Sequence, residues 1–356
     1  LPVNRGRFNV ARIRFDYYRD ATVALEAFKS GAYDYRQENI SKQWATAYTG
    51  PPFDEGRIVK ETIPNQIPAG MQCFAMNQRR PLFGDRRVRF ALAHAFDFEW
   101  TNQQLFFGMY HRTDSYFENS VMEAQGLPSG QELAILNPLR EKLWPEVFTQ
   151  DYAPPSTKGP NGLRRNLLRA LDLLREAGWQ VQDGVLRQTD TGMPFEFEIL
   201  LAQPSFERVV LPFIANLKRL GIRARVRLVD SSQYINRLRE FDYDMIVAVF
   251  GQSLSPGNEQ RWYWSSEAAD IPGTRNYVGI KSEAVDRLVE RVISAESREA
   301  LVTRCKALDR ALLWGHHVIP HWYSGEFHVA YASWLKHPEK LPPYGLALDA
   351  WWADKP

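Results

Sequence analysis

Apolar residues recur with two different periods in the middle of the chain, and each period predicts its own kind of element. A helical period, with apolar residues on one stripe, is present over 163–178, 205–221 and 231–241. Alternating or short continuous apolar runs, typical of strands, cover 195–202, 223–229 and 243–251. Because strands and helices alternate, we expect a βαβαβ unit over 195–251 with parallel strands.

The segment FGDRRVRFALAHAFDFEW, residues 83–100, carries four basic side chains beside an apolar stripe. Asp85 is placed to cap one helix, and Asp97 is placed to cap a second helix that ends at Gly108. The stripe of the first helix consists of Val88, Ala91, Leu92, Ala95 and Phe96. The other side carries Arg86, Arg87 and His94, and charge normally stays in water. We therefore expect an amphipathic helix with a solvated basic face.

Composition narrows the classes of protein that this chain can represent. Its 356 residues suffice for two or three lobes, at roughly 150 residues per domain. The 44 Lys and Arg against 42 Asp and Glu leave a net charge of +2, so we expect no nucleic-acid partner. No stretch approaches the roughly 18 to 20 apolar residues of a membrane span. Cys73 and Cys305 fit neither a zinc knuckle nor a disulfide scaffold, and we expect no metal and no cofactor.

Two loops leave the carboxyl ends of the predicted strands, where the ligand crevice of open α/β sheets lies. The loop at 202–208 leads into a helix that Ser205 is placed to cap, and the positive helix N-terminus together with Arg208 would favour a carboxylate. The loop at 251–260 is rich in glycine, amide and hydroxyl groups that can pair with a peptide backbone. Its candidate ligand-binding residues are Gly251, Gln252, Ser253, Ser255, Asn258 and Glu259.

Aromatic residues close behind the second loop are candidates for lining side-chain pockets, because ligand pockets are mostly apolar with a few placed polar groups. Trp264 and Tyr277 are such residues, and Tyr277 directly follows Asn276. The competing interpretation is that they fill the core, as most aromatic side chains of a large lobe do. We include Trp264, Asn276 and Tyr277 in the expected ligand site.

Two kinds of chemistry compete with ligand binding as an interpretation. GQSLS at 251–255 nearly spells the GxSxG nucleophile elbow, with Ser253 as nucleophile, but Ser255 replaces the final glycine and no helix pattern follows directly. His316, His317 and His321 suggest a metal site, but nothing fixes them on one face with a carboxylate. We expect no enzyme, and we keep an α/β serine hydrolase using Ser253 as an alternative.

Several segments, in order along the chain, resemble the solute-binding proteins of peptide and nickel ABC transporters, bacterial family 5. LFGDRRVRFALAHAFDFEW at 82–100 is similar to the family segment P-F-x-D-x-R-V-R-x-A-L-x-x-A-x-D. Further family segments are matched by DATVALEAFKSGAYDYR, LLREAGW, REFDYDMIV, SEAVDRLVERV and VIPHWYSG. LPVNRGRFN, YYRDATVALEAFK and SLSPGNEQRWYWSS resemble the YejA-like branch, whose members look like receptors for oligopeptides and peptide-like antimicrobial compounds.

The resemblance implies an α/β periplasmic-binding-protein fold of two lobes joined by a hinge, with this chain covering the later part of the family's length. Residues 1–70 would be the end of lobe one, 71–320 lobe two, and 321–356 a return to lobe one, with crossings at 68–77 and 316–325. It also implies a receptor that captures oligopeptides or peptide-like compounds between the lobes and delivers them to an inner-membrane ABC permease. A sugar or a metal chelate is the alternative ligand.

The resemblance further implies a monomer in the periplasm. LPVNRGRFNV shows no charged region followed by an apolar core, so we expect the secretory signal in an N-terminal part that precedes this chain. Peptide-binding relatives hold the ligand's α-ammonium with an Asp at the position that matches Ser255, and Glu259 is the expected substitute. Arg208 corresponds to an arginine that some dipeptide-binding relatives use for the ligand carboxylate.

Overall fold

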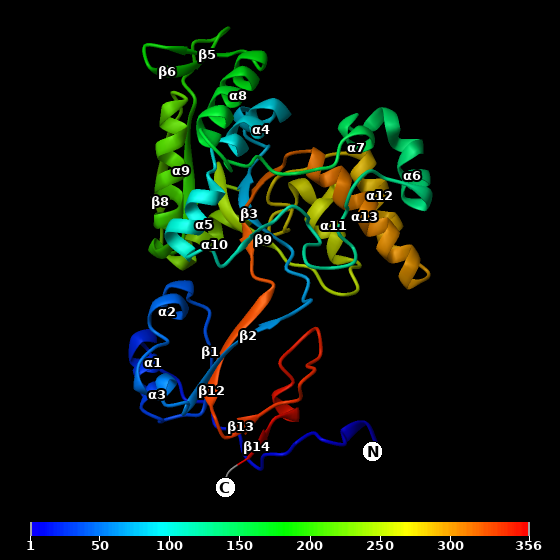
Figure 1. The fold of residues 1–356 in the computed structure, drawn as a ribbon. Helices are drawn as coiled ribbons and strands as arrows, with labels where there is room; N and C mark the ends of the chain where they lie inside the picture. The colour runs from blue at the N-terminus through cyan, green and yellow to red at the C-terminus, as the bar shows by residue number, and fades with distance from the viewer. Residues whose placement is uncertain (1, 355–356) are drawn as a thin grey trace. The chain divides into compact units, whose positions relative to one another are not determined.

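The computed structural model describes residues 2–354, whose internal contacts form two compact units (Figure 1). The first unit consists of 2–67, 106–109 and 324–354, and the second of 68–105 and 110–323. The predicted lobe limits, residues 70 and 320, each lie three residues from the crossings after 67 and 323. That the two units are the lobes of a receptor stays a prediction. The sequence pattern gives no sign that 106–109 belong to the first unit, where Met109 packs against an apolar cluster.

The first unit is built on an antiparallel sheet in which β12 (Glu326–Ala332) lies between β1 (Tyr35–Gln37) and β2 (Ile58–Pro64) (Figure 1). Its helices are α1 (Ala21–Lys29), α2 (Ser41–Thr46) and α3 (Pro51–Asp54). An apolar cluster holds helices and sheet together and consists of Leu25, Phe28, Trp44, Tyr48, Ile58 and Ala330. Two short strands, β13 (Leu335–Lys336) and β14 (Trp352–Ala353), pair with each other.

A five-stranded mixed sheet forms the centre of the second unit, in the order β10-β3-β9-β7-β8. These strands are β3 (Met71–Met76), β7 (Glu196–Leu201), β8 (Arg223–Leu228), β9 (Met245–Phe250) and β10 (Val318–Pro320). β7 pairs in parallel with β8 and β9, and α9 (Glu207–Arg219) and α10 (Ser231–Arg239) connect the strands, which confirms the predicted βαβαβ unit. β3 and β10 add antiparallel strands at one edge of the sheet. The sequence pattern does not predict this pairing, because a short apolar run does not specify its partner strand.

Further helices and strands complete the second unit. The helices are α4 (Arg86–His94), α5 (Phe98–Phe106), α6 (Gly130–Leu136), α7 (Glu146–Thr149), α8 (Gly162–Glu176), α11 (Glu259–Trp264), α12 (Glu283–Ile293) and α13 (Arg298–Trp314). The strand pairs are β5 (Trp179–Gln182) with β6 (Val185–Gln188) and β4 (His111–Arg112) with β11 (Trp322–Tyr323). Within residues 2–354, no helix combines the length and apolarity needed to span a membrane.

The two predicted helix caps in the 83–100 segment are confirmed. The Asp85 carboxylate accepts a hydrogen bond from the Arg87 N–H at 2.8 Å, and α4 begins at Arg86. The Asp97 carboxylate accepts a hydrogen bond from the Trp100 N–H at 3.0 Å at the start of α5. Both caps depend on residues within one turn of the helix start, so the sequence alone suffices to place them.

The predicted solvated basic face of α4 is wrong for all but Arg87. Arg89 is buried and donates hydrogen bonds to four backbone carbonyls, those of Phe83, Gly84, Gly315 and His316. Arg86 is largely buried against Glu146 at 2.9 Å, and His94 is buried as well. The reason is tertiary, because α8 packs against α4 on one side and β10 on another, so little of the helix surface faces water.

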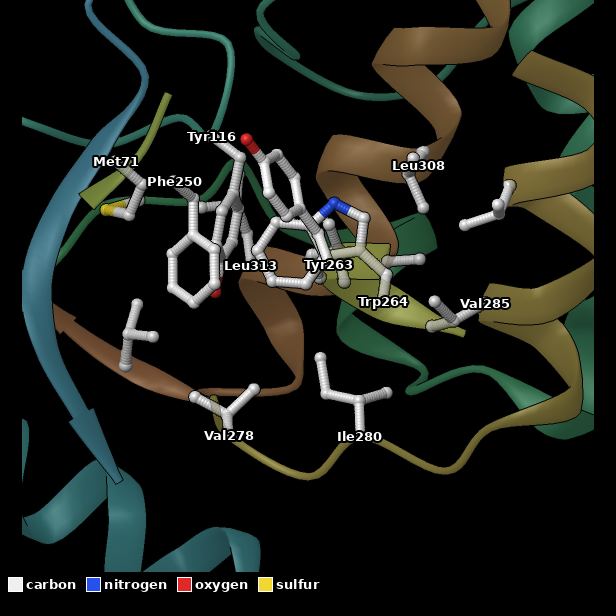
Figure 2. Close-up of a cluster of buried hydrophobic side chains, with 14 of the residues drawn as sticks. Met71, Tyr116, Phe250, Tyr263, Trp264, Val278, Ile280, Val285, Leu308 and Leu313 are labelled. Atoms are coloured by element: carbon white, nitrogen blue, oxygen red, sulfur yellow. The ribbon is translucent and has the colours of Figure 1, made fainter. Parts of the chain in front are cut away.

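An apolar cluster of the second unit surrounds Trp264, as Figure 2 shows. The Trp264 ring lies 4.5 Å from the Phe250 ring and 4.9 Å from the Tyr116 ring, centroid to centroid. Val285 of α12 and Leu308 of α13 complete its surroundings (Figure 2). Cys73 and Cys305, both buried, are free thiols in this part of the chain. The cluster fixes α11 against the end of β9 and thereby positions the loop between them.

Candidate ligand-binding site

Residues 251–258 form an irregular loop that joins the carboxyl end of β9 to α11. Gly70, which precedes β3, lies against the start of this loop and has a φ of +65°. A Cβ atom on Gly70 would clash with the Phe250 carbonyl oxygen and lie 3.1 Å from the Gly251 Cα. Only glycine permits this close approach of two backbone segments, so the loop is held from behind by main chain.

Internal hydrogen bonds give the loop a defined shape. The Ser253 Oγ accepts from the Ser255 N–H at 3.1 Å, and the Glu259 Oε1 accepts from the Gly257 N–H at 2.8 Å. The Tyr263 hydroxyl donates to the Gly251 carbonyl at 3.3 Å. The loop is therefore closed onto itself and onto α11, although it contains no regular secondary structure.

The predicted site residues differ in their access to solvent. Gly251, Ser253, Ser255 and Asn258 are exposed, and Gln252, Glu259 and Tyr277 are half-buried. The Tyr277 ring lies 5.8 Å from the Phe250 ring, which brings it to the end of the same strand from which the loop leaves. These seven residues thus gather around the carboxyl end of β9, with polar groups that can reach a ligand.

Trp264 and Asn276 are buried and have structural roles. Trp264 fills the core described above, and its indole N–H donates to Gln260 Oε1 at 3.0 Å. The Asn276 side-chain amide donates to the carbonyls of Ser265 and Ile280, and its Oδ1 accepts from the N–H groups of Gly279 and Ile280. Because the polar atoms of both side chains are already paired inside the protein, we leave both residues out of the site proposed below.

Arg208 is exposed in the first turn of α9, and it follows β7, the strand that pairs with β9. The carboxyl ends of these two parallel strands meet at one edge of the sheet, so Arg208 and the 251–258 loop lie at the same edge. The predicted cap by Ser205 is wrong. Pro204 begins a 3₁₀ turn, η4 (Pro204–Phe206), which runs directly into α9 and leaves Phe206 at the cap position without a side-chain bond.

Two residues near the loop escaped the sequence-based prediction. Gln260 is fully buried and links Trp264 to Gln252, whose Oε1 accepts from Gln260 Nε2 at 2.7 Å. Arg275 donates to the Val249 carbonyl at 3.0 Å and to the Tyr263 hydroxyl at 3.0 Å. Burial raises the pKa of Tyr263, and the Arg275 guanidinium partly offsets this effect. No periodic signal could reveal either residue, because each acts through partners that the fold brings together.

A separate cavity of about 670 Å³ lies at the opposite, amino ends of the parallel strands, beside Glu196, Arg223 and Asp244. Its cations are paired with its own carboxylates, Arg225 with Glu198 at 2.7 Å and Arg80 with Asp242 at 3.0 Å. Arg223 pairs with Glu196 at 2.7 Å in the same way. Such mutual pairing leaves little charge for a ligand, so this cavity is the weaker candidate.

The loop around Ser253 does not have the geometry that a serine hydrolase requires. Ser253 lies in an exposed loop, and eight residues, 251–258, separate β9 from α11, whereas a nucleophile elbow is a sharp strand-to-helix turn. The histidines at 316, 317 and 321 are close in sequence but do not share partners. The His316 ring stacks on the Phe90 ring with centroids 4.0 Å apart, and His317 pairs with the Gln78 side chain at 3.0 Å. In residues 2–354, no group of three or more His, Cys, Asp or Glu side chains is arranged to hold a metal ion.

Residues 4–271 match the profile of the bacterial extracellular solute-binding proteins, family 5 (middle region). This match covers about three quarters of the chain. The chain belongs to family 5 of the extracellular solute-binding proteins. In that family context the loop after β9 is a candidate for solute contacts rather than for catalysis, consistent with the geometry of Ser253.

Two relatives of this family 5 chain extend the match over its whole length. An uncharacterised protein of Sinorhizobium fredii, y4wM, is 48% identical over 356 residues, which are 99% of this chain and 54% of that protein. The probable peptide-binding protein YejA of Agrobacterium fabrum is 43% identical over 358 residues, which cover 100% of this chain and 58% of YejA. The chain thus spans little more than half the length of these relatives.

The fold is also similar to that of a solved two-lobed binding protein. The oligopeptide-binding protein AppA of Bacillus subtilis, solved with a nonapeptide, superimposes with a TM-score of 0.66 at 19% sequence identity. The match covers 94% of this family 5 chain and 59% of AppA. The α/β periplasmic-binding-protein fold that the sequence predicts is therefore confirmed.

Proposed function

We propose that the protein containing this chain is the substrate-binding receptor of an ABC importer. It captures an oligopeptide or a peptide-like compound and delivers it to an inner-membrane permease. It acts in the periplasm as a monomer and performs no chemistry of its own. The observation that carries the proposal is the run of exposed backbone, hydroxyl and amide groups over 251–258, at the carboxyl end of β9, in a chain of the solute-binding family.

The proposed contacts divide the ligand into four parts: backbone amides, side chain, α-ammonium and carboxylate. The exposed residues Gly251, Ser253, Ser255 and Asn258, together with Gln252, pair with peptide amides, and Tyr277 borders a side-chain pocket. Glu259 takes the α-ammonium, and Arg208 takes the carboxylate. Because amide hydrogen bonds carry no side-chain identity, a receptor built in this way accepts many side chains and selects mainly for backbone and length.

Native mass spectrometry of the protein as purified tests the proposal, followed by calorimetry with tri-, tetra- and penta-alanine. We expect co-purified peptide, or binding of at least one alanine peptide without turnover. Failure to bind any peptide, together with binding of a sugar or of a nickel–histidine chelate, would replace the peptide by one of the alternative ligands. Ester hydrolysis that disappears in Ser253→Ala would instead establish the hydrolase, since removing a nucleophile costs several orders of magnitude in rate.

A further inference from the structure

A line of three side chains runs from the core to the 251–258 loop. The Trp264 Nε1 lies 3.0 Å from Gln260 Oε1, and the Gln260 Nε2 lies 2.7 Å from Gln252 Oε1. Trp264 and Gln260 are fully buried, and Trp264 is fixed by the surrounding aromatic rings (Figure 2). The hydrogen-bonded series therefore starts at the fixed Trp264 side chain and ends at Gln252 in the loop.

The Trp264 indole sets the orientation of the Gln260 and Gln252 side-chain amides. An indole N–H only donates, so the oxygen of the Gln260 amide must face Trp264. The Gln260 nitrogen then faces Gln252 and also donates to Glu259 Oε1 at 3.1 Å. The side-chain oxygen of Gln252 must accept this bond. The Gln252 NH₂ group therefore points away from Gln260 and can still donate.

The Gln252 Nε2 is buried and has no hydrogen-bond partner among residues 2–354. A buried donor without an acceptor is unfavourable, and native proteins rarely keep one without a reason. Rotation of the amide by 180° gives no relief, because it would set the Gln252 nitrogen against the Gln260 nitrogen. The protein thus holds one buried amide donor in a fixed direction within the loop that carries the proposed site.

We propose that the Gln252 side-chain amide donates a hydrogen bond to a carbonyl oxygen of the bound peptide, and that Trp264 and Gln260 act as positioning residues for this amide. The inference rests on the proposed peptide-binding function and names the residue that recognises the ligand backbone. A fixed donor favours a carbonyl acceptor and disfavours a donor such as an ammonium at the same place. Glu259, the first residue of α11, is then left for the α-ammonium.

The first test replaces the donor by an acceptor of the same shape. Gln252→Glu keeps the bond from Gln260 Nε2 but can no longer donate, and we expect it to weaken tetra-alanine binding about tenfold or more in calorimetry. The matched control is Gln180→Glu, the same chemical change on the exposed face of β5, which should leave affinity unchanged. Equal affinity of wild type and Gln252→Glu would overturn the inference while leaving the proposed function intact.

The second test asks whether Trp264 acts through Gln252. Trp264→Phe removes the indole N–H that orients Gln260, and we expect weaker tetra-alanine binding in the wild-type background but no further loss when Gln252 is already Glu. A loss of the same size in both backgrounds would show that Trp264 supports the fold only, and would overturn its positioning role. Thermal unfolding of each variant separates loss of stability from loss of affinity.

A direct readout observes the Gln252 amide in the wild-type protein and uses Gln252→Glu only to assign its signal. In protein labelled with ¹⁵N at glutamine side chains, the signal absent from Gln252→Glu is that of the Gln252 amide. Addition of tetra-alanine should shift this signal downfield, as a new hydrogen bond does, and leave the Gln180 signal in place. An unmoved Gln252 signal at saturating peptide overturns the inference, whereas absence of peptide binding by any measure overturns the proposed function and the inference with it.

Discussion

Arg89 illustrates at the scale of one residue how a buried cation is stabilised without a carboxylate. Its guanidinium donates to the carbonyl oxygens of Phe83 and Gly84 at 2.9 Å, of Gly315 at 2.8 Å and of His316 at 3.1 Å. Burial, followed by the charge of Arg86, lowers the pKa of Arg89 to about 10, so the side chain stays charged at neutral pH. It joins the start of α4 to the turn that follows α13.

We expect Arg89→Met to lower the free energy of unfolding by about 3–5 kcal/mol, because it leaves buried carbonyl groups without their donor. Arg87→Met is the matched control: Arg87 is exposed and paired with Asp85, and such a surface pair contributes about 0–1 kcal/mol. Urea unfolding of the two variants measures the difference. Similar losses in both would contradict a structural role that is specific to Arg89.

The carboxylate of Glu259 is expected to matter only for ligands with a free amino terminus. Glu259→Gln keeps the acceptor for the Gly257 N–H but removes the negative charge proposed to hold the ligand's α-ammonium. We expect about tenfold weaker binding of free tetra-alanine and little change for N-acetylated tetra-alanine, as measured by calorimetry. Glu267→Gln, at an exposed position, is the control. Equal effects on the two peptides would mean that Glu259 does not bind the ammonium.

Elements meet at Gly70, where the approach to β3 touches the end of β9. Gly70→Ala would place a methyl group against the Phe250 carbonyl at a residue whose φ is +65°. We expect it to destabilise the protein by about 2 kcal/mol or more and to displace the start of the ligand loop. Gly251→Ala serves as control, because no heavy atom lies within 4 Å of its Cβ position, and it should change stability by less than about 0.5 kcal/mol. Chemical denaturation of both variants checks the contrast.

Helices and strands could be predicted from the sequence where they depend on residues that are close together in the chain. The caps of α4 and α5 and the alternation of β7, α9, β8, α10 and β9 follow from neighbours in sequence, and the structure confirms them. The basic face of α4 was mispredicted because the packing of α8 and β10 against it is not encoded in its own period. The expected Ser205 cap failed because the turn that begins at Pro204 merges with α9.

At the scale of the whole molecule, Glu118 connects the parts of the second unit that adjoin both crossings. Its carbonyl oxygen accepts from the Ala69 N–H at 2.9 Å, just after the first crossing. Its carboxylate accepts from the N–H groups of Asp114 at 2.9 Å and Asn119 at 3.2 Å. Burial and then Glu118 raise the pKa of Tyr323, the last residue before the return crossing. Burial, with nearby Asp114 and Glu123, raises the pKa of Glu118 to about 8.

This raised pKa predicts a pH dependence of stability. Between about pH 4.5 and pH 8 the folded protein holds a proton on Glu118 that the unfolded chain has released. Stability should therefore fall as the pH rises through this window, by at most about 1.4 kcal/mol per pH unit for this group. Asp309, whose pKa burial raises to about 7, acts in the same direction.

Unfolding free energies at pH 5 and pH 8.5 measure the effect. Glu118→Gln should lose less stability than the wild type between these two values, because the amide does not titrate. Glu141→Gln, which changes an exposed carboxylate of the same unit, should retain the wild-type difference. A Glu118→Gln profile as steep as that of the wild type would assign the pH dependence to other groups.

The amino-acid sequence is sufficient to identify the family, the βαβαβ unit and the loop in which ligand contacts are expected. These depend on motifs, on hydrophobic period and on the rule that loops at the carboxyl ends of parallel strands form the crevice, all of which are local or topological. Tertiary structure alone decided that β3 and β10 extend the sheet and that Trp264 belongs to the core. It also decided that the oxygen of the Gln252 amide faces Gln260, because the orientation of a side chain depends on atoms that only the fold brings within hydrogen-bonding distance.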